Sequence, residues 1–450
     1  MNPGRNLDNR TESAPHTGYV SRIIRLFLIY IATVTVLTGF LVLSAFIPRK
    51  LLADHMAASA DYLCDTELFG VIWDGVPASK IDHYADSILL NIAWNYDSAH
   101  PIRSVMESSY YYRDGQNENF NLRDAVYDEL SPNREYLRYW HGSVALVRPL
   151  LIIMSLQGIY IFWGVVLLLL LITLLWRLIR AKEYFCTVGI VLGAVLTFSW
   201  FVPFSLEYTW VYLVMLVSAH VIMGVSYSKP GTGGRITAVL MVSGIVCAYL
   251  DFLTAETLTL TVPLLLAVCL LARRGSDVRD LLFLSIRSAI AWAMGYAGMF
   301  VIKWGLASLI LSGNALDHVT GNAAERVNGL VLDMAYFTFF GPMIKNFRTI
   351  LPFSLGTAGA IAGVILLLGC VYAGYVHCRP GARIGVVLIY LAIAVIPLVR
   401  FIALRNHSVL HYFFTCRALL GTILGICLIM GETLGPAGTG RRFGGSRSVV

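Results

Sequence analysis

The chain has 450 residues, a net charge of +7 and a mean hydropathy of +0.69, with 57% hydrophobic and only 14% charged residues. A soluble chain of this length would carry about a quarter charged residues, so the composition excludes a soluble globular protein. The basic residues form short clusters between apolar runs and show no interleaved aromatics, which argues against a nucleic-acid partner.

Ten apolar runs follow one another along the chain. A membrane-spanning helix needs roughly 20 apolar residues, and most of these runs reach that length. They therefore predict an all-α polytopic membrane protein of about ten transmembrane helices. The predicted spans are 24–47, 155–176, 184–202, 209–227, 236–252, 258–272, 282–302, 351–376, 384–403 and 418–434. The run at 258–272 is short, which allows a tilted or partly re-entrant helix.

The spans divide the chain into a small set of regions. We predict a cytoplasmic tail over 1–23, a first transmembrane helix over 24–47, a mainly helical outer domain over 48–154, a multi-span bundle over 155–434 with a second outer loop at about 313–350, and a disordered cytoplasmic tail over 435–450. The outer domain is long enough to form a small folded unit of its own.

Lys and Arg indicate the orientation, because basic residues in short loops stay in the cytoplasm. They gather before the first span and in every even-numbered connection, as at Arg22, Arg180, Arg273 and Arg383. Both termini should therefore be cytoplasmic in a multi-pass protein of the plasma membrane, with membrane lipid as its surroundings.

Several kinds of chemistry are not encoded in a recognisable form. The sequence contains no Walker A motif, no GxSxG and no GxGxxG that opens a helix after a strand, so we expect no nucleotide cofactor. Its eight cysteines include no CxxC pair, so neither a zinc ribbon nor a disulfide framework is expected. We predict no cofactor and no metal.

Two aspartates mark the first candidate site, in the outer domain. Asp82 and Asp86 lie four residues apart, which places them on one face of a helix. Two neighbouring carboxylates can separate their pKa values, leaving one able to act as a base. The alternative is structural, because Ser79-x-x-Asp82 resembles a capping box.

Aromatic and cationic residues precede the second span. Around Arg138 and His141, the segment 136–142 reads Tyr-Leu-Arg-Tyr-Trp-His-Gly. Such residues commonly form the aromatic belt at a membrane interface. The alternative is a platform on which sugar rings stack while Arg138 or His141 reaches a hydroxyl or a phosphate group.

Acids also lie at the outer ends of spans, at Glu207, Asp251 and Glu256. Ionisable groups at membrane depth are costly and usually functional, although near the interface they can reach water. Of the three, Asp251 is the site candidate.

A cationic cluster near the end of the chain is the fourth candidate. Its members are Arg400, Arg405, His407, His411 and Arg417. His407 and His411 have helical metal-ligand spacing, but without the glutamate of HExxH zinc is not favoured. A phosphate clamp suits the set better, because Arg offers a bidentate fork. The alternative is an ordinary outer loop with aromatic anchors.

The layout resembles the C superfamily of membrane glycosyltransferases. In these enzymes a first span leads to a large outer loop with an acidic residue, followed by short helices along the membrane and a bundle of spans. Here the resemblance rests on Asp82 and Asp86, on 138–142, and on 405–417. The adjacent acidic pair of many such enzymes is missing, so which acid is the base stays open.

The resemblance implies an inverting transfer of sugar from a polyprenyl-phosphate donor. The acceptor hydroxyl would belong to a glycan, lipid or protein on the outer face. One loop carboxylate would be the general base, and the cationic cluster would stabilise the departing phosphate. The alternatives are a lipid or small-molecule transporter or flippase, and a non-catalytic membrane scaffold. A cavity at the membrane surface favours the transferase, and a central path with charges at mid-membrane favours transport.

Overall fold

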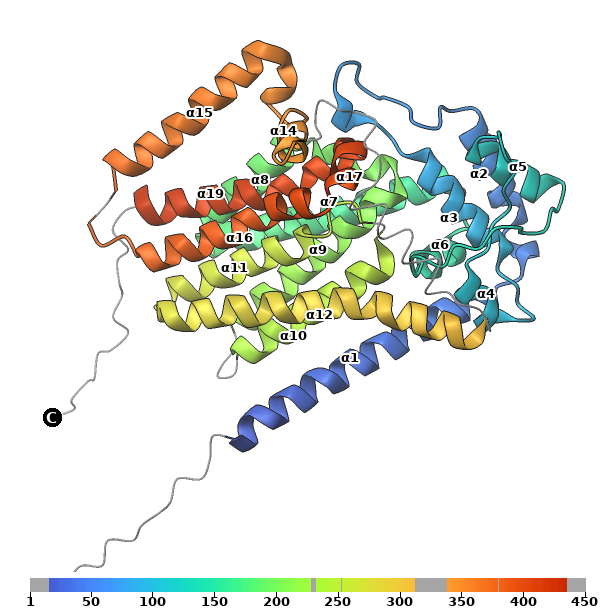
Figure 1. Cartoon of the computed structure of the whole chain (residues 1–450), viewed down its shortest axis with the longest axis horizontal. Coiled ribbons are helices and arrows are strands. Elements are labelled where there is room, and N and C mark those ends of the chain that lie inside the picture. Colours follow the sequence, from blue (N-terminus) through green and yellow to red (C-terminus); the bar gives the residue numbers. More distant parts are fainter. Residues whose placement is uncertain (1–15, 228–231, 252, 312–337, 379, 435–450) are drawn as a thin grey trace, which may run out of the picture.

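The computed structural model describes residues 16–227, 232–251, 253–311, 338–378 and 380–434. Within these ranges the protein consists of helices and connecting segments, with two isolated β-bridges and no strand (Figure 1). The prediction of an all-α polytopic membrane protein is confirmed.

The ten predicted spans correspond to ten helices in the described residues. Eight regions are long and apolar enough to cross a membrane, and they contain α1 (His16–Ala45), α7 (Leu156–Arg180), α9 (Leu206–Ser226), α10 (Thr232–Leu250), α12 (Val278–Ile310), α15 (Gly356–Val376), α16 (Ile384–Ala403) and α19 (Leu419–Leu434). The other two are the shorter apolar helices α8 (Tyr184–Leu196) and α11 (Leu258–Arg273).

Polar contacts bring one end of α8 and one end of α11 together. At one end, Arg273 at the close of α11 lies 3.6 Å from Glu183, which precedes α8. At the same end, Arg383 before α16 pairs with Glu432 near the end of α19 and donates to the Ala272 carbonyl at 2.7 Å. One end of the bundle therefore gathers the starts of α8 and α16 and the closing turns of α11 and α19.

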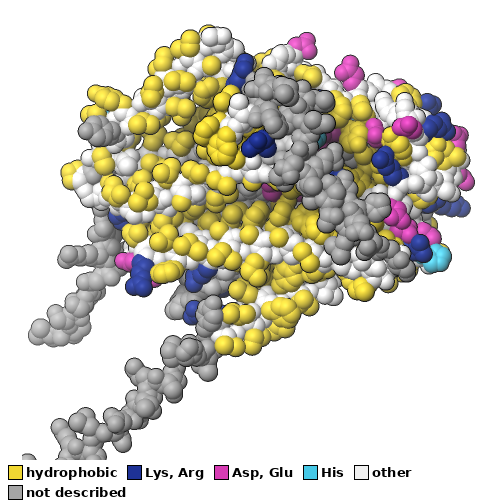
Figure 2. Space-filling view, viewed as in Figure 1, with side chains coloured by type: hydrophobic (Ala, Val, Ile, Leu, Met, Phe, Trp, Pro, Cys, Tyr) yellow, Lys and Arg dark blue, Asp and Glu magenta, His cyan; other side chains and the backbone are white. Residues whose placement is uncertain are grey.

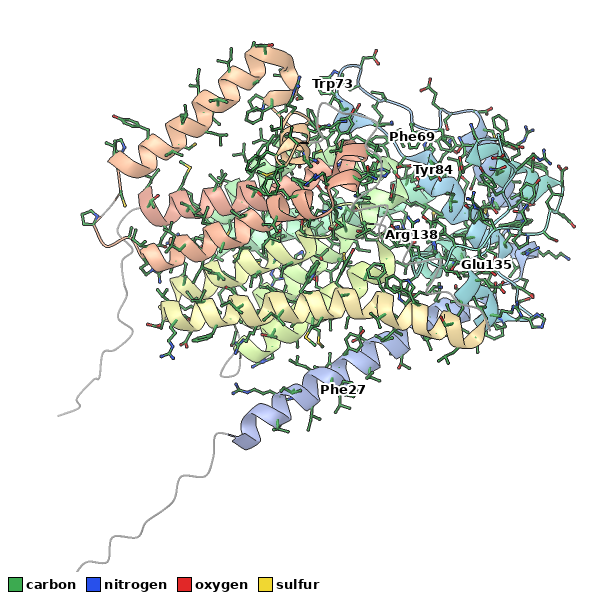
Figure 3. All side chains as sticks on the ribbon, in the orientation of Figure 1. Phe27, Phe69, Trp73, Tyr84, Glu135 and Arg138 are labelled. Carbon is green, nitrogen blue, oxygen red and sulfur yellow. The ribbon has the colours of Figure 1, made fainter. Side chains whose placement is uncertain are left out.

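The helices differ in how they meet the lipid. α1 and α15 lie at the periphery of the bundle (Figure 1), and Phe27 on α1 is 61% exposed (Figure 3). In contrast, nearly every residue of α11 is buried by other helices. At 16 residues this helix is about 24 Å long, shorter than the hydrocarbon layer. Because α11 is enclosed by protein, its length does not have to match the lipid. It is one continuous helix.

Residues 48–154, which we call the loop domain, lie at the other end of the bundle (Figure 1). The domain contains η1 (Arg49–Leu51), α2 (Ala53–Cys64), η2 (Pro77–Ser79), α3 (His83–Asn95), α4 (Pro101–Glu107), α5 (Glu118–Tyr127) and α6 (Val144–Leu150). α2, α3 and α5 pack around Leu63, Leu89 and Leu122. Charged side chains gather over this end, whereas the flank of the bundle is mostly apolar (Figure 2).

Two buried cations tie the loop domain to the spans. Arg148 on α6 donates to the carbonyls of Ala93 and Ile47, and so joins α3 to the end of the first span. Lys303 on α12 donates to the Val105 and Met106 carbonyls at 2.9 and 3.0 Å, which satisfies the C-terminal end of α4. The loop domain is therefore held firmly on the bundle.

Some predicted boundaries are wrong. α8 ends at Leu196 and not at residue 202, because Phe198 has φ 53° and the chain continues as the 3-10 helix η3 (Ser199–Phe204), which contains Pro203. α12 runs eight residues past the predicted end at 302, because its last turns pack on the loop domain through Lys303 and Ala307.

Other predictions fall partly outside the described residues. Of the second loop, predicted at about 313–350, only the part from 338 is described, and it contains the short helix α14 (Gly341–Phe347). The tail at 435–450 and most of 1–23 also lie outside the described residues.

Candidate functional site

The candidate site lies where the loop domain meets the spans, at the N-terminal ends of α3 and α9. Asp86, in the first turn of α3, points at the start of α9 and accepts from the backbone N–H groups of Leu206 (3.1 Å) and Glu207 (3.3 Å). The Tyr160 hydroxyl donates to the same carboxyl at 2.5 Å and the Ser205 hydroxyl at 3.2 Å. Asp86 thus caps a neighbouring helix across the domain junction.

Asp82 has a different environment from Asp86. It is the N-cap residue of α3 and accepts from the Ala85 N–H at 3.0 Å. The Ser79 hydroxyl donates to Trp73 and Val76 carbonyls, so the predicted capping box with Ser79 as the cap is wrong. The side chain of Asp82 lies close to that of Glu207, and both line the same cavity. Two carboxyl groups in such contact share one proton, because both cannot ionise at low cost.

Burial raises the pKa of both aspartates. Burial raises the pKa of Asp82, although the Ala85 N–H, Glu207 and the nearby Lys80 act against the shift. Burial raises the pKa of Asp86 to about 7, against the hydrogen bonds from Tyr160 and α9. A carboxyl with a raised pKa is a stronger base once ionised.

A cavity of about 80 Å³ opens beside Asp82. Asp82 and Glu207 supply its acidic lining, and His407 and His411 line it from the late segment of the chain. The remaining lining residues are mostly aromatic or apolar: Tyr84, Ala85, Ile88, Tyr136, Tyr139, His141 and Phe414. A volume of this size holds a few water molecules or the reacting groups of a larger ligand, not a whole sugar-lipid.

His407 is oriented by Arg400, at the end of α16. The Arg400 guanidinium lies 3.3 Å from Nδ1 of His407. A guanidinium has no acceptor, so Nδ1 must accept, and the neutral imidazole carries its proton on Nε2. His407, which lines the cavity, therefore has a hydrogen-bond donor at Nε2.

Arg400 is itself fixed by a buried ion pair. It donates to both carboxylate oxygens of Glu256, at 2.7 and 3.2 Å, and also to the Ser408 hydroxyl at 3.0 Å. Both side chains of the ion pair are almost fully buried, at 6% and 5% exposed. The pair therefore fixes the short helix α17 (Arg405–Leu410), which carries His407.

Aromatic rings form the other side of the junction. The His141 ring lies 4.7 Å from that of Tyr136, and His411 stacks on Phe414 at 5.1 Å. Tyr84 stacks on Phe69 at 5.9 Å, and Figure 3 shows both side chains at the junction. Stacked and edge-on rings of this kind can bind the apolar faces of sugars.

The structure brings together some of the predicted site residues and not others. The described lining of the cavity includes Asp82, His141, His407 and His411, but not Arg138 or Arg405. Arg138 is half-buried at the junction (Figure 3), and Arg405 is half-buried on α17. The transferase hypothesis predicts a cavity that gathers Asp82 or Asp86 with Arg405 or Arg417. Among the described lining residues of this cavity, only Asp82 of these four is present.

Two predicted residues have structural contacts. The Arg417 guanidinium donates to the carbonyls of Ala78 (2.8 Å) and Phe413 (3.2 Å), and it lies 4.6 Å above the Tyr208 ring. Asp251 accepts from both the N–H and the hydroxyl of Thr254, at 3.1 and 2.5 Å, and so closes the turn after α10. Burial raises the pKa of Asp251 to about 7.

Two residues of the junction were not predicted as site residues. Glu207 was placed below Asp251, yet it lines the cavity beside Asp82. Lys80 was not considered, and its ammonium lies 4.4 Å from the Phe69 ring and 4.7 Å from the Phe413 ring, two residues before Asp82. The sequence did contain a signal for Glu207, because this acid lies at the outer end of a span. An ionisable side chain is costly there unless it has a polar partner.

Compared with protein-family models, with curated proteins and with solved structures, the chain has no match. The site must therefore be interpreted from its own chemistry. It combines a carboxyl pair able to take up a proton, a histidine fixed as a donor, and aromatic walls, at the junction of the spans with a polar domain.

Proposed function

We propose that this protein is a membrane glycosyltransferase that moves a sugar from a polyprenyl-phosphate donor to a hydroxyl group of a glycan, lipid or protein acceptor. The observation that carries the proposal is the cavity that brings Asp82 and Glu207 together with His407 and His411 at the junction of the loop domain and the spans. A displacement at a sugar carbon requires a base for the acceptor and a hydrogen-bond donor for the leaving phosphate.

The reaction follows from these positions. Asp82 takes the proton of the acceptor hydroxyl, and the acceptor oxygen forms a bond to the anomeric carbon. The bond between that carbon and the phosphate oxygen breaks on the opposite side, so the configuration inverts. Nε2–H of His407 donates to the phosphate as negative charge develops on it. Glu207 shares the proton of the pair and so adjusts the basicity of Asp82.

An apolar groove supports a lipid substrate. It has a volume of about 530 Å³ and lies along α7, α9 and α10, with Trp163, Val214 and Val242 among its lining residues. Val214, Ser218 and Val221 follow Glu207 by 7, 11 and 14 residues, so all four lie on one face of α9. A prenyl chain in this groove would direct its phosphate toward the end of α9 that carries Glu207.

The distribution of charge supports the orientation we propose, with both termini in the cytoplasm and the loop domain outside. The polar contacts of Arg273, Arg274 and Arg383 gather at the end of the bundle opposite the loop domain. Basic residues at short connections favour the cytoplasmic side. The site would then face the outer surface of the plasma membrane.

A lipid flippase is the second candidate, and the apolar groove favours it too. Transporters place charged groups near mid-membrane. Among the described spans, the buried charged side chains lie toward the ends instead: Glu207, Lys303 and Arg400 near the loop domain, and Glu432 at the other end. This distribution supports chemistry at the surface over transport through the centre.

The experiment is to purify the full chain in detergent and identify the lipids that remain bound by mass spectrometry. We expect a polyprenyl-phosphate sugar, with retention reduced about tenfold or more in His407→Ala. His100→Ala is the matched control, because this imidazole is 72% exposed on the loop domain. Equal retention of the lipid by both variants, or the absence of any phosphorylated prenyl lipid, would contradict the proposal. Adding acceptor distinguishes the two candidates. A transferase should release polyprenyl phosphate, whereas a flippase should leave the donor intact.

A further inference from the structure

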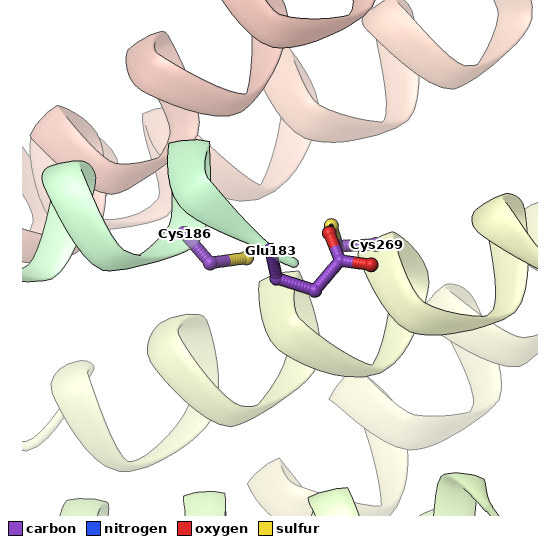
Figure 4. A group of neighbouring side chains, drawn as sticks. All are labelled: Glu183, Cys186 and Cys269. Carbon is purple, nitrogen blue, oxygen red and sulfur yellow. Dashed lines mark hydrogen bonds between the residues drawn. The ribbon is translucent and has the colours of Figure 1, made fainter. Parts of the chain in front are cut away.

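A second group of reactive side chains lies at the end of the bundle opposite the loop domain. Glu183 precedes α8, Cys186 is in the first turn of α8, and Cys269 comes from α11 (Figure 4). All three are buried, at 7%, 1% and 3% exposed. One ligand atom from each lies within 4.8 Å of the other two, and among the described residues this is the one such group of three.

One spacing within the group matches a tetrahedral metal site. The Cys269 sulfur is 3.4 Å from Oε2 of Glu183. A tetrahedral zinc ion with Zn–S of about 2.3 Å and Zn–O of about 2.0 Å holds sulfur and oxygen ligands about 3.5 Å apart. Glu183 and Cys186 are three residues apart at the start of a helix, which turns both toward α11. The three side chains therefore converge without a change in either helix.

The Glu183 carboxylate has weak partners for a buried charge. Its Oε2 accepts from the Cys269 thiol, a weak donor, and lies 3.6 Å from Nε of Arg273, a side chain that is 45% exposed. Buried carboxylates normally have strong hydrogen bonds or a cation at close range. A bound cation would neutralise the Glu183 carboxylate more completely than the Cys269 thiol and Arg273 do.

Charge balance also fits a divalent ion. Two thiolates and one carboxylate around a divalent metal leave a net charge of −1, and Arg273 beside Glu183 offsets it. The Tyr390 side chain on α16 lies near Cys269, which makes its phenol a candidate for the fourth ligand. Water is the other candidate for that position.

We propose that Glu183, Cys186 and Cys269 bind a zinc ion, with Tyr390 or water as the fourth ligand. The site would join α8 to α11, the two helices that are too short to be classed as spans by length. Its role would be structural, because it lies at the end of the bundle away from the carboxyl pair of Asp82. The inference does not depend on the glycosyltransferase proposal.

The test is metal analysis of the full chain purified without chelator and then equilibrated with zinc. We expect about one zinc per chain, and at least a tenfold weaker affinity in Cys186→Ser and in Cys269→Ser. Cys247→Ser and Cys427→Ser are matched controls, because these two buried thiols lie on α10 and α19 outside the group. Cobalt in place of zinc should give a thiolate-to-metal charge-transfer band in the near ultraviolet.

Three outcomes would overturn the zinc site. They are the absence of a cobalt–thiolate band in the wild-type protein, equal zinc retention in the four variants, and recovery of Cys186 and Cys269 as a disulfide. The cobalt spectrum of the wild-type protein keeps the test decisive even where a serine variant fails to fold. A zinc-dependent rise in melting temperature, absent from Cys186→Ser, would mark the site as structural.

Discussion

Asp86→Asn should destabilise the protein because Asp86 caps α9 from another domain. The carboxyl accepts from the N–H groups of Leu206 and Glu207 and from the Tyr160 hydroxyl. An asparagine keeps one oxygen but turns an amide donor toward groups that also donate. Losing a helix cap costs about 0.5–2 kcal/mol, and losing a buried hydrogen bond between neutral groups costs about 0.5–1.5 kcal/mol. Below about pH 6, where a carboxyl of pKa about 7 is protonated, the expected loss in the free energy of unfolding is therefore roughly 1–3.5 kcal/mol.

The assay is unfolding of the purified protein in detergent, by temperature and by denaturant. Asp114→Asn is the control, because Asp114 is exposed in the turn before α5 and should stay within about 0.5 kcal/mol of the wild type. Tyr160→Phe removes the same hydrogen bond from the other side. The Asp86→Asn and Tyr160→Phe effects should therefore be non-additive, with a coupling of about 0.5–3 kcal/mol. If Asp86→Asn unfolded like Asp114→Asn, the capping role would be refuted.

Three further predictions follow from the same contacts. Stability should fall as pH rises from about 4 to 7 and level off above that, and Asp86→Asn should flatten the curve. Burial raises the pKa of Asp86 from its ordinary value of 3.8 to about 7, so the stability that comes from the protonated form is fully present below the unfolded pKa and is lost as pH rises through the folded pKa. Arg400→Met should lower the free energy of unfolding by about 3–5 kcal/mol because it leaves Glu256 charged and buried, and adding Glu256→Met should restore much of this loss. Equal stability of the single and double variants would contradict a stabilising ion pair between Arg400 and Glu256. In a variant whose eight cysteines are replaced, a membrane-impermeant thiol probe should label Asp114→Cys in intact cells but Arg180→Cys only after permeabilisation. The reverse result would mean that the loop domain faces the cytoplasm.

The spans were predictable because their signal is local. A run of apolar residues forms a helix in lipid because the hydrocarbon layer offers no hydrogen-bond partners. Every backbone N–H must therefore be hydrogen-bonded within the segment itself. The errors occur where tertiary contacts decide. Phe198 adopts a left-handed conformation that ends α8 early, and Lys303 keeps α12 helical where its end packs on the loop domain.

The candidate site was only partly predictable, for a related reason. The spacing of Asp82 and Asp86 indicated a shared helix face, and both are indeed at the start of α3. Nothing in that spacing shows that Asp86 caps α9 while Asp82 meets Glu207, because those partners come from 120 residues away or more. The members of the cationic cluster likewise have different roles, because their partners are distant in sequence. Arg417 donates a hydrogen bond to the Ala78 carbonyl, whereas His407 lines the cavity.

The central claim is that Asp82 is the base of a sugar transfer from a polyprenyl-phosphate donor. The most direct test is turnover of a labelled polyprenyl-phosphate sugar by the protein in lipid vesicles, measured as released polyprenyl phosphate. Asp82→Asn should lower the rate by about a hundred- to ten-thousand-fold, while Asp114→Asn keeps the wild-type rate. Melting temperature, measured in parallel, separates lost chemistry from lost folding. Wild-type turnover in a folded Asp82→Asn variant would contradict the account.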